Sequence, residues 1–183
     1  MPLPALQTDR LLLRPYALTD VSDLVRLAGA REIAATTLRI PHPYREQDAV
    51  EFISSFRAEA DMGTSARFAV TLIDGGVLCG GIGLRIEKAH QHAEVGYWIG
   101  VPYWGKGYAT EAGRAVIRYG FETLALRRIF ASCLTSNAAS GRVLKKLGMQ
   151  YEGCQRSHIC KWEKFYDLDL YGMLAPDQST ARS

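Results

Sequence analysis

Residues 67–100 constrain the fold most strongly, because three apolar runs follow one another there with no helical segment between them. In the first run, RFAVTLI, residues Phe68, Val70 and Leu72 recur at every second position, which is the pattern of a half-buried strand. The triplet DGG at residues 74–76 predicts a hairpin turn. VLCGGIGLRIE and AEVGYWIG supply the second and third strands. Strands joined by such short connections are expected to form an antiparallel meander.

The chain changes to a helical period directly after this meander. The segment VPYWGKGYATEAG has glycines at 105 and 107, and an apolar stripe at helical spacing starts there, formed by Tyr108, Ala112, Ala115, Val116 and Tyr119. RRIFASCL then has the composition of a buried strand of a parallel sheet. A helix between two strands is the kind of connection that parallel neighbours need, so the sheet is expected to be mixed.

Further elements flank this centre on both sides. A first strand, RLLLRPY, and two helices precede the meander, and a short helix, NAASGRVLKKLG, follows the parallel strand. Asn137 is the expected N-cap of that helix, and Gly148 ends it. Two strand-like runs, residues 149–153 and KFYDLDLYGML, complete the pattern. The order β-α-α-β-β-β-α-β-α-β-β predicts an α/β fold in one domain, residues 1–175, with a polar tail at 176–183.

Composition places the chain among ordinary globular proteins. Of its 183 residues 48% are hydrophobic and 22% charged, and the net charge of +3 is far from the basic signature of nucleic-acid binders. No apolar run is long enough for a signal peptide or a membrane span, so neither nucleic acid nor a membrane is an expected partner. The four cysteines lack CxxC spacing, which favours free thiols in a cytoplasmic protein. Three of them lie in apolar or strand-like runs and are expected to be buried.

The two-glycine segment has the local chemistry of an anion site. A helix that starts after a strand presents unpaired N–H groups and the positive end of its dipole, and glycines let a phosphate approach the backbone closely. The segment does not match the P-loop string, and the dinucleotide fingerprint needs a small residue where Thr110 stands. By itself, the pair Gly105 and Gly107 favours a tight turn before a helix over a phosphate site.

Four segments in order, TDRLLLRP, YWGKGYATEA, NAASGRVLKKLGM and YDLDLYGML, resemble the GNAT acetyltransferase superfamily, and its RimJ/RimL branch in particular. The resemblance implies a single-domain α/β fold whose mixed, mostly antiparallel sheet is splayed between its fourth and fifth strands and flanked by about four helices. It also implies an enzyme that transfers the acetyl group of acetyl-CoA to a primary amine, with no metal.

The resemblance assigns the cofactor contacts. The pyrophosphate would be held by backbone N–H groups of Gly105, Lys106, Gly107, Tyr108, Ala109 and Thr110. Pro102 departs from the family pattern, which usually has Gln or Arg there, and proline has no N–H to offer. The pantetheine arm would pair with the free edge formed by Trp98, Ile99 and Gly100. Asn137 would reach the pantetheine amides, besides its role as an N-cap.

The implied reaction needs a base, an oxyanion donor and a group that assists the leaving thiolate. Glu94 is the candidate base, against the alternative of an exposed carboxylate at a strand end, and the N–H of Trp98 or Ile99 is the candidate oxyanion donor. Many family members have a tyrosine where this chain has Leu144, so Ser140 is the candidate near the sulfur; its alternative role is that of a first-turn helix serine. Tyr97, Tyr166 and Tyr171 are further hydroxyl donors, although their pattern favours core or cross-strand aromatic packing.

The residues do not identify the acceptor. RimL-like proteins suggest a protein N-terminus of the ribosomal type, while other relatives suggest an amino acid, a polyamine or an antibiotic. In the loop RIPHPYREQD, the residues Arg39, His42 and Tyr44 either meet the acceptor or form a rigid proline loop. His90 and His92 lack a third ligand, which favours a polar loop over a metal site. The other hypotheses are a non-catalytic acyl-CoA-binding module and a nucleotide-binding regulator, and a homodimer is an expected assembly.

Overall fold

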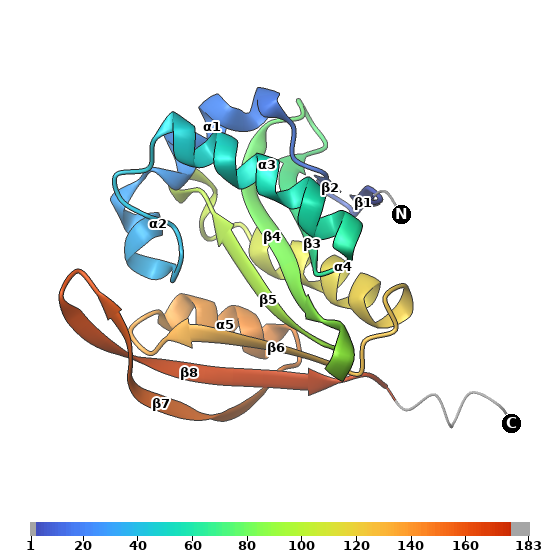
Figure 1. Ribbon diagram of the computed structural model, residues 1–183, viewed down its shortest axis with the longest axis vertical. Helices are drawn as coiled ribbons and strands as arrows, with labels where there is room; N and C mark the ends of the chain where they lie inside the picture. The colour runs from blue at the N-terminus through green and yellow to red at the C-terminus, as the bar shows by residue number, and fades with distance from the viewer. Residues whose placement is uncertain (1–2, 177–183) are drawn as a thin grey trace, which may run out of the picture.

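The computed structural model describes residues 3–176, which form one eight-stranded sheet with helices on both faces (Figure 1). The strands are β1 (Leu6–Gln7), β2 (Leu11–Arg14), β3 (Ser65–Leu72), β4 (Leu78–Glu87), β5 (His92–Ile99), β6 (Arg128–Leu134), β7 (Gln150–Lys161) and β8 (Lys164–Leu174). The helices are α1 (Val21–Ala28), α2 (Arg31–Thr36), α3 (Glu46–Met62), α4 (Tyr108–Glu122) and α5 (Ala138–Lys146), with short 3-10 turns at Leu18–Asp20, Lys88–His90 and Val101–Tyr103. Apart from Pro176, the predicted tail lies outside the described residues.

The sheet confirms the predicted mixed topology. Its order is β1-β2-β3-β4-β5-β6-β8-β7, and the strands β3, β4 and β5 form the expected antiparallel meander. Among the strands of residues 3–176, β5 and β6 are the only parallel neighbours, and they are connected through α4. Helices cover both faces of the sheet, which explains why β3 and β4 are buried at most of their positions.

The predicted splay lies between β5 and β6. These strands pair only at His92 with Arg128, Ala93 with Ile129, and Glu94 with Phe130. Beyond that point β5 stays paired with β4, and β6 stays paired with β8. The two strands therefore diverge from Glu94 onward, and Figure 1 shows them meeting at one end and separating toward the other.

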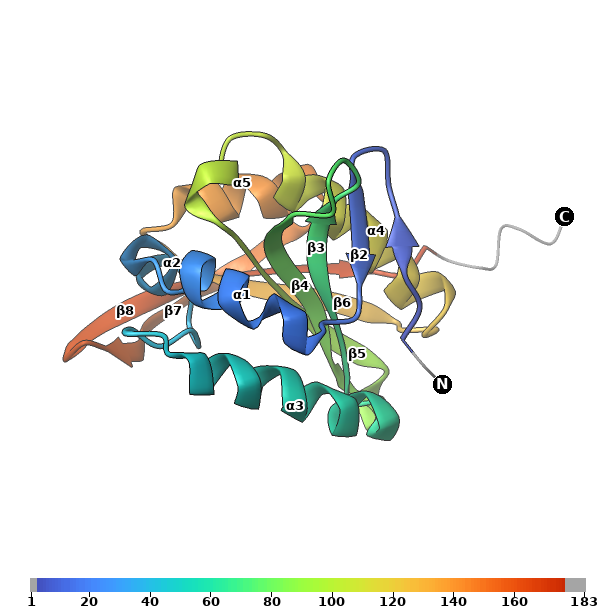
Figure 2. The same cartoon turned by 90° about the horizontal axis from the view of Figure 1, so that it is seen from above.

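Two apolar clusters hold the layers together, one on each face of the sheet. Helices α1, α2 and α3 cover one face through Leu24, Leu27, Ile33, Ala49 and Ile53, which pack on Ala69 and Leu78. Helices α4 and α5 cover the other face through Ala112, Ala115, Val116 and Leu144, which pack with Phe68, Val70 and Leu84. Figure 2 shows α1 and α3 on one side of the sheet and α4 on the other.

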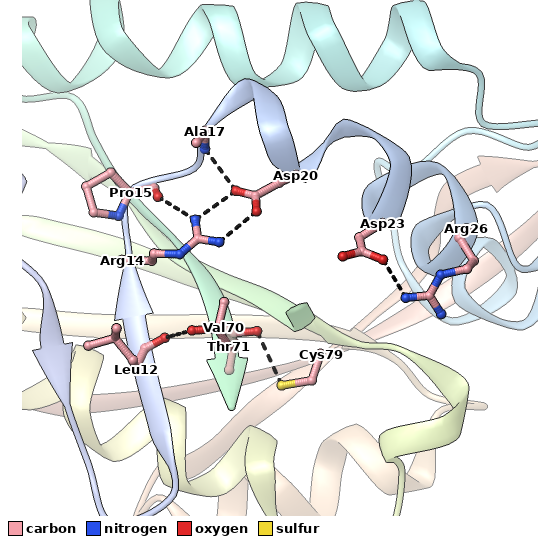
Figure 3. A network of polar contacts seen from close by, with 10 residues as sticks. All are labelled: Leu12, Arg14, Pro15, Ala17, Asp20, Asp23, Arg26, Val70, Thr71 and Cys79. Carbon is pink, nitrogen blue, oxygen red and sulfur yellow. Dashed lines mark hydrogen bonds and ion pairs between the residues drawn. The ribbon is translucent and has the colours of Figure 1, made fainter. Parts of the chain in front are cut away.

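A partly buried ion pair connects β2 to the 3-10 turn before α1 (Figure 3). The guanidinium of Arg14 donates to both carboxylate oxygens of Asp20, at 2.8 and 2.7 Å, and the N–H of Ala17 donates to the same carboxylate at 2.9 Å. Burial opposes the charge of Asp20, but these hydrogen bonds outweigh it and lower the pKa of the carboxyl group. The entry into α1 is therefore fixed by charge as well as by packing.

The structure differs from the sequence prediction in four places. It has a short additional strand, β1, before the predicted first strand, so the splay expected between the fourth and fifth strands lies between β5 and β6. It has five α-helices where about four were expected, because α2 occupies a segment of only six residues. The strand predicted at residues 149–153 extends to Lys161. The prediction was too short because β7 is an exposed edge strand without an apolar pattern. Cys79 and Cys133 are buried, whereas Cys154 and Cys160 lie exposed on that edge strand, so the expectation of three buried thiols is wrong.

Candidate active site

The segment Gly105–Gly107 forms a cradle of backbone N–H groups at the start of α4. Gly105 and Gly107 adopt left-handed φ angles of 74° and 82°, and space is open around the position that a Cβ of Gly105 would take. The first hydrogen bond of the helix runs from the N–H of Glu111 to the carbonyl of Gly107. Within residues 3–176, the N–H groups of residues 105–110 therefore have no protein acceptor, which is the condition for binding an anion.

Arg10 braces this cradle from the N-terminal side. Its guanidinium donates to the carbonyl of Lys106 at 3.0 Å and to the carboxylate of Glu111 at 2.8 Å, and it lies over the ring of Tyr108 at 4.8 Å. Thr8 also donates to Glu111, at 2.7 Å. Burial disfavours the charge of Glu111, but the bonds from Thr8 and Arg10 lower its pKa. Arg10 therefore holds the loop through the carbonyl of Lys106 and does not engage the N–H groups of residues 105–110.

The opened edge of β5 offers fewer free groups than the sequence suggested. Gly100 donates its N–H to the carbonyl of Cys79 at 2.9 Å and accepts from Tyr103 at 2.8 Å, so its backbone is not available for pairing with an extended ligand. The reason is the 3-10 turn at Val101–Tyr103, which draws the chain out of the strand. The N–H and C=O groups of successive residues point to opposite edges of a strand. The backbone groups of Trp98 therefore point toward β4, like the N–H of Gly100, and those of Ile99 point toward the opening. Ile99 is thus the better placed of the two oxyanion candidates.

Glu94 lies at the point where β5 and β6 separate, between three side chains from different elements. Its carboxylate accepts hydrogen bonds from Arg85 at 2.6 Å, from Arg39 at 3.0 Å and from Ser132 at 3.1 Å. Burial raises the pKa of this group, but the two guanidinium groups and Ser132 outweigh burial, and the net shift is downward. Glu94 is therefore an ionised, half-buried carboxylate, and the alternative of an exposed strand-end residue does not describe it.

Ser140 and Tyr97 meet across the opening of the sheet. The hydroxyl of Tyr97, on β5, lies 2.8 Å from the hydroxyl of Ser140, on α5. Burial raises the pKa of Tyr97 to about 12, so this phenol keeps its proton at neutral pH. The N–H of Ser140 donates to the side chain of Asn137 at 3.1 Å, which confirms Asn137 as the N-cap of α5. The amide of Asn137 also donates to the carbonyl of Thr36 at 3.2 Å and so connects α5 to α2.

Among residues 3–176, the other tyrosine and histidine candidates make no hydrogen bond to Glu94, Ser140 or Tyr97. Leu144 is fully buried, and Tyr171 packs against Gly141, where an added Cβ would lie 3.2 Å from the phenol oxygen. Tyr44 packs on the cluster beneath α1 and α3, and burial raises its pKa to about 12. His90 stacks on His92 at 5.7 Å.

Two further findings concern the described part of the chain. Among residues 3–176, no group of three or more His, Cys, Asp and Glu side chains is arranged to hold a metal ion. No helix in the same range combines the length and the apolar character needed to cross a membrane.

Sequence reasoning missed Arg10, Arg85 and the partnership of Tyr97 with Ser140. Arg10 and its partner Glu111 are separated by 101 positions, and Ser140 lies 43 positions from Tyr97. The available signal for Arg10 was its place in the segment TDRLLLRP, at the start of the predicted first strand.

The site combines a mixed sheet that opens at its parallel strand pair with a row of backbone N–H groups at the start of the following helix. Residues 10–150 match the family model described as Acetyltransferase (GNAT) domain. The chain belongs to this family and is an N-acetyltransferase of the GNAT type.

Three relatives illustrate how far the similarity extends. The uncharacterized N-acetyltransferase YoaA of Bacillus subtilis is 32% identical over 174 residues, which are 94% of this chain and 98% of YoaA. The ribosomal-protein-serine acetyltransferase of Escherichia coli is 30% identical over 51% of this chain and 52% of its own length. The structure of RimL, a ribosomal L7/L12 alpha-N-protein acetyltransferase in complex with coenzyme A, has a TM-score of 0.87 over 94% of this chain and 98% of RimL, with 16% identity, which shows a shared fold.

Proposed function

We propose that the protein takes its acetyl group from acetyl-CoA and transfers it to the N-terminal amine of a protein. The observation that carries this proposal is the row of N–H groups at residues 105–110, which have no protein acceptor and lie beyond the opened edge of β5. Such a row favours a phosphate, and an opened strand edge favours an extended ligand with amide groups. Coenzyme A has both parts, and the complex of RimL with coenzyme A supports the same choice.

Each part of the donor has a place in this arrangement. The pyrophosphate lies against the N–H groups of Gly105, Lys106, Gly107, Tyr108, Ala109 and Thr110. The pantetheine arm runs along β5 beside Ile99, while Trp98 and Gly100 hold that strand to β4. Asn137 fixes the start of α5 on the other side of the arm. The thioester then lies between Ser140 and Glu94, near the point where the strands meet.

The chemistry follows from these neighbours. The ammonium of the acceptor loses one proton through water to the ionised carboxylate of Glu94, and the neutral nitrogen attacks the acetyl carbon. The N–H of Ile99 donates to the carbonyl oxygen as negative charge develops on it. When the carbon–sulfur bond breaks, a proton from the nitrogen ends on the sulfur. The hydroxyl of Ser140, held by the protonated phenol of Tyr97, is placed to relay that proton.

The test is a measurement of thiol release from acetyl-CoA with two sets of acceptors. One set contains peptides with free N-termini, and the other contains amino acids, polyamines and aminoglycoside antibiotics. We expect release with peptides, and release that needs both Glu94 and Ser140. Turnover of small amines alone would reject the protein acceptor. Tight binding of coenzyme A without turnover of any amine would identify a binding module instead of an enzyme.

A further inference from the structure

A cavity of about 470 Å³ lies beside α2, at the turn end of the β7–β8 hairpin. Its lining consists of Arg31, His42, Trp162, Lys164 and Tyr166. Two of these side chains are basic, one is a histidine and two are aromatic, and no carboxylate is among them. The volume is within the range of small-ligand sites, roughly 300–1,000 Å³. Figure 1 shows the hairpin turn approaching α2 on the side of the sheet where β5 and β6 have separated.

The walls of this cavity are held in place by specific contacts. The ammonium of Lys161, next to the hairpin turn, donates to the carbonyls of Ala34 and Thr37 at the end of α2. Lys161 and Arg31 lie over the ring of Trp162, at 5.1 and 5.9 Å from its centre. Burial lowers the pKa of Lys161. The hairpin and α2 are thus joined, and the bond from Asn137 to Thr36 connects α2 to the helix that carries Ser140.

The same segment leads from the cavity to the catalytic centre. Arg31 begins α2, and Arg39, three residues beyond Thr36, donates to the carboxylate of Glu94. Six helical residues rise about 9 Å, and three extended residues add at most about 10 Å, so the path is roughly 20 Å or less. An extended peptide covers that length with about six residues. A peptide whose N-terminal amine lies near Glu94 can therefore place a side chain from its first six residues in the cavity.

We infer that this cavity binds an acidic side chain of the acceptor peptide, so that the enzyme selects N-termini with Asp or Glu among their first six residues. The inference rests on the proposed acetylation of a protein N-terminus. Arg31 offers a planar pair of donors that fits a carboxylate, and Lys164 adds a second positive charge. Trp162 and Tyr166 cover the methylene groups of the bound side chain. The nearby carboxylates Glu32 and Glu163 are exposed and do not line the cavity.

The test compares hexapeptides that differ only by Asp against Asn, or Glu against Gln, at one position from two to six. For wild-type enzyme with acetyl-CoA, we expect kcat/KM to be at least tenfold higher for the acidic member at one or more positions, since one charge-assisted hydrogen bond is worth roughly 1.5–3 kcal/mol. In the double variant Arg31→Gln/Lys164→Gln this ratio should fall toward one, through a rise in KM for the acidic peptide. A ratio near one in the wild type at every position overturns the inference.

The double variant Arg114→Gln/Arg118→Gln is the matched control. It removes the same charge from exposed positions of α4 and should keep the preference for the acidic peptide. Loss of the preference in this control would indicate a general effect of net charge and would also overturn the inference. Glutamate and O-phosphoserine serve as small anionic amines, and turnover of either as fast as that of the acidic peptide would refute a peptide as the occupant.

A second readout separates this inference from the proposed function. The anisotropy of a fluorescently labelled peptide is measured with protein loaded with coenzyme A, and this signal does not depend on turnover. Acid-dependent binding without acetylation would refute the proposed chemistry and keep the cavity assignment. Acetylation with equal binding and turnover of acidic and neutral peptides would refute the cavity assignment and keep the proposed chemistry.

Discussion

A proline in the first turn of α4 tests the cradle directly. Ala109 lies in that turn, and its N–H has no protein acceptor within residues 3–176. The substitution Ala109→Pro removes this one donor, and helices tolerate proline in the first turn because no internal hydrogen bond is lost. If the N–H binds a phosphate oxygen, the variant loses one charge-assisted hydrogen bond while its fold remains intact.

The expected magnitude follows from that single bond. A hydrogen bond to a charged group contributes roughly 1.5–3 kcal/mol. Each 1.4 kcal/mol changes an equilibrium constant about tenfold, so the affinity for coenzyme A should fall roughly 10- to 150-fold. The control Ala109→Gly keeps the N–H and costs the helix about 1 kcal/mol or less in stability, so its affinity for coenzyme A should stay within a few-fold of wild type.

Calorimetric titration with coenzyme A gives the affinity, and thermal unfolding without ligand checks the fold. Acetyl-pantetheine, which lacks the pyrophosphate, is the matched substrate, and its kcat/KM should be the same for Ala109→Pro and wild type. Two results would refute the reasoning. One is unchanged affinity for coenzyme A in a folded Ala109→Pro variant, and the other is an equal loss with acetyl-pantetheine.

Three more predictions concern the charged and hydroxyl groups. Glu94→Gln should lower kcat by about 10²- to 10⁴-fold with little change in affinity for coenzyme A, as measured by thiol release and titration; an unchanged kcat would remove Glu94 from the mechanism. Ser140→Ala and Tyr97→Phe should each lower kcat, and the double variant should lose less than the product of the two effects, because the hydroxyls act as a pair; independent effects would contradict the pairing. Asp20→Asn should cost about 1–3 kcal/mol of unfolding free energy at pH 7, since Asp20 accepts from Arg14. The pKa of Asp20 is lower in the folded state, so its contribution to the free energy of unfolding is present above the ordinary pKa of 3.8 and is lost as the pH falls below that value. Denaturation at pH 7 and at pH 3 should therefore show that the difference in unfolding free energy between variant and wild type is smaller at pH 3.

Much of the fold could be predicted from local patterns. The meander over β3, β4 and β5 follows from a period of two and a glycine-rich turn, and α4 follows from a helical stripe after Gly107. Those signals lie within single elements. The segment α2 is too short for a clear stripe, and β7 is exposed on an edge, so neither has the periodicity that burial on one face imposes.

Some residues of the candidate site could be identified from the sequence, and others could not. The residues of the cradle are consecutive, so the sequence could identify Gly105 and Gly107 together with the helix they precede. The partners of Glu94 could not be identified, because Arg39 and Arg85 come from other elements, and their approach depends on how those elements pack. The expectation for Gly100 failed for a related reason, since the turn that follows it engages its backbone.

The sequence by itself determined the order of strands and helices apart from β1 and α2, together with the family and the row of backbone donors that suits a phosphate. These properties depend on neighbouring residues, whose spacing the chain specifies directly. Only the tertiary structure decided that Glu94 is an ionised carboxylate between two arginines, that Ser140 meets Tyr97, and that Arg10 braces the cradle. Those contacts join residues far apart in the chain, and they exist because the opened sheet and its two helical layers bring distant elements together.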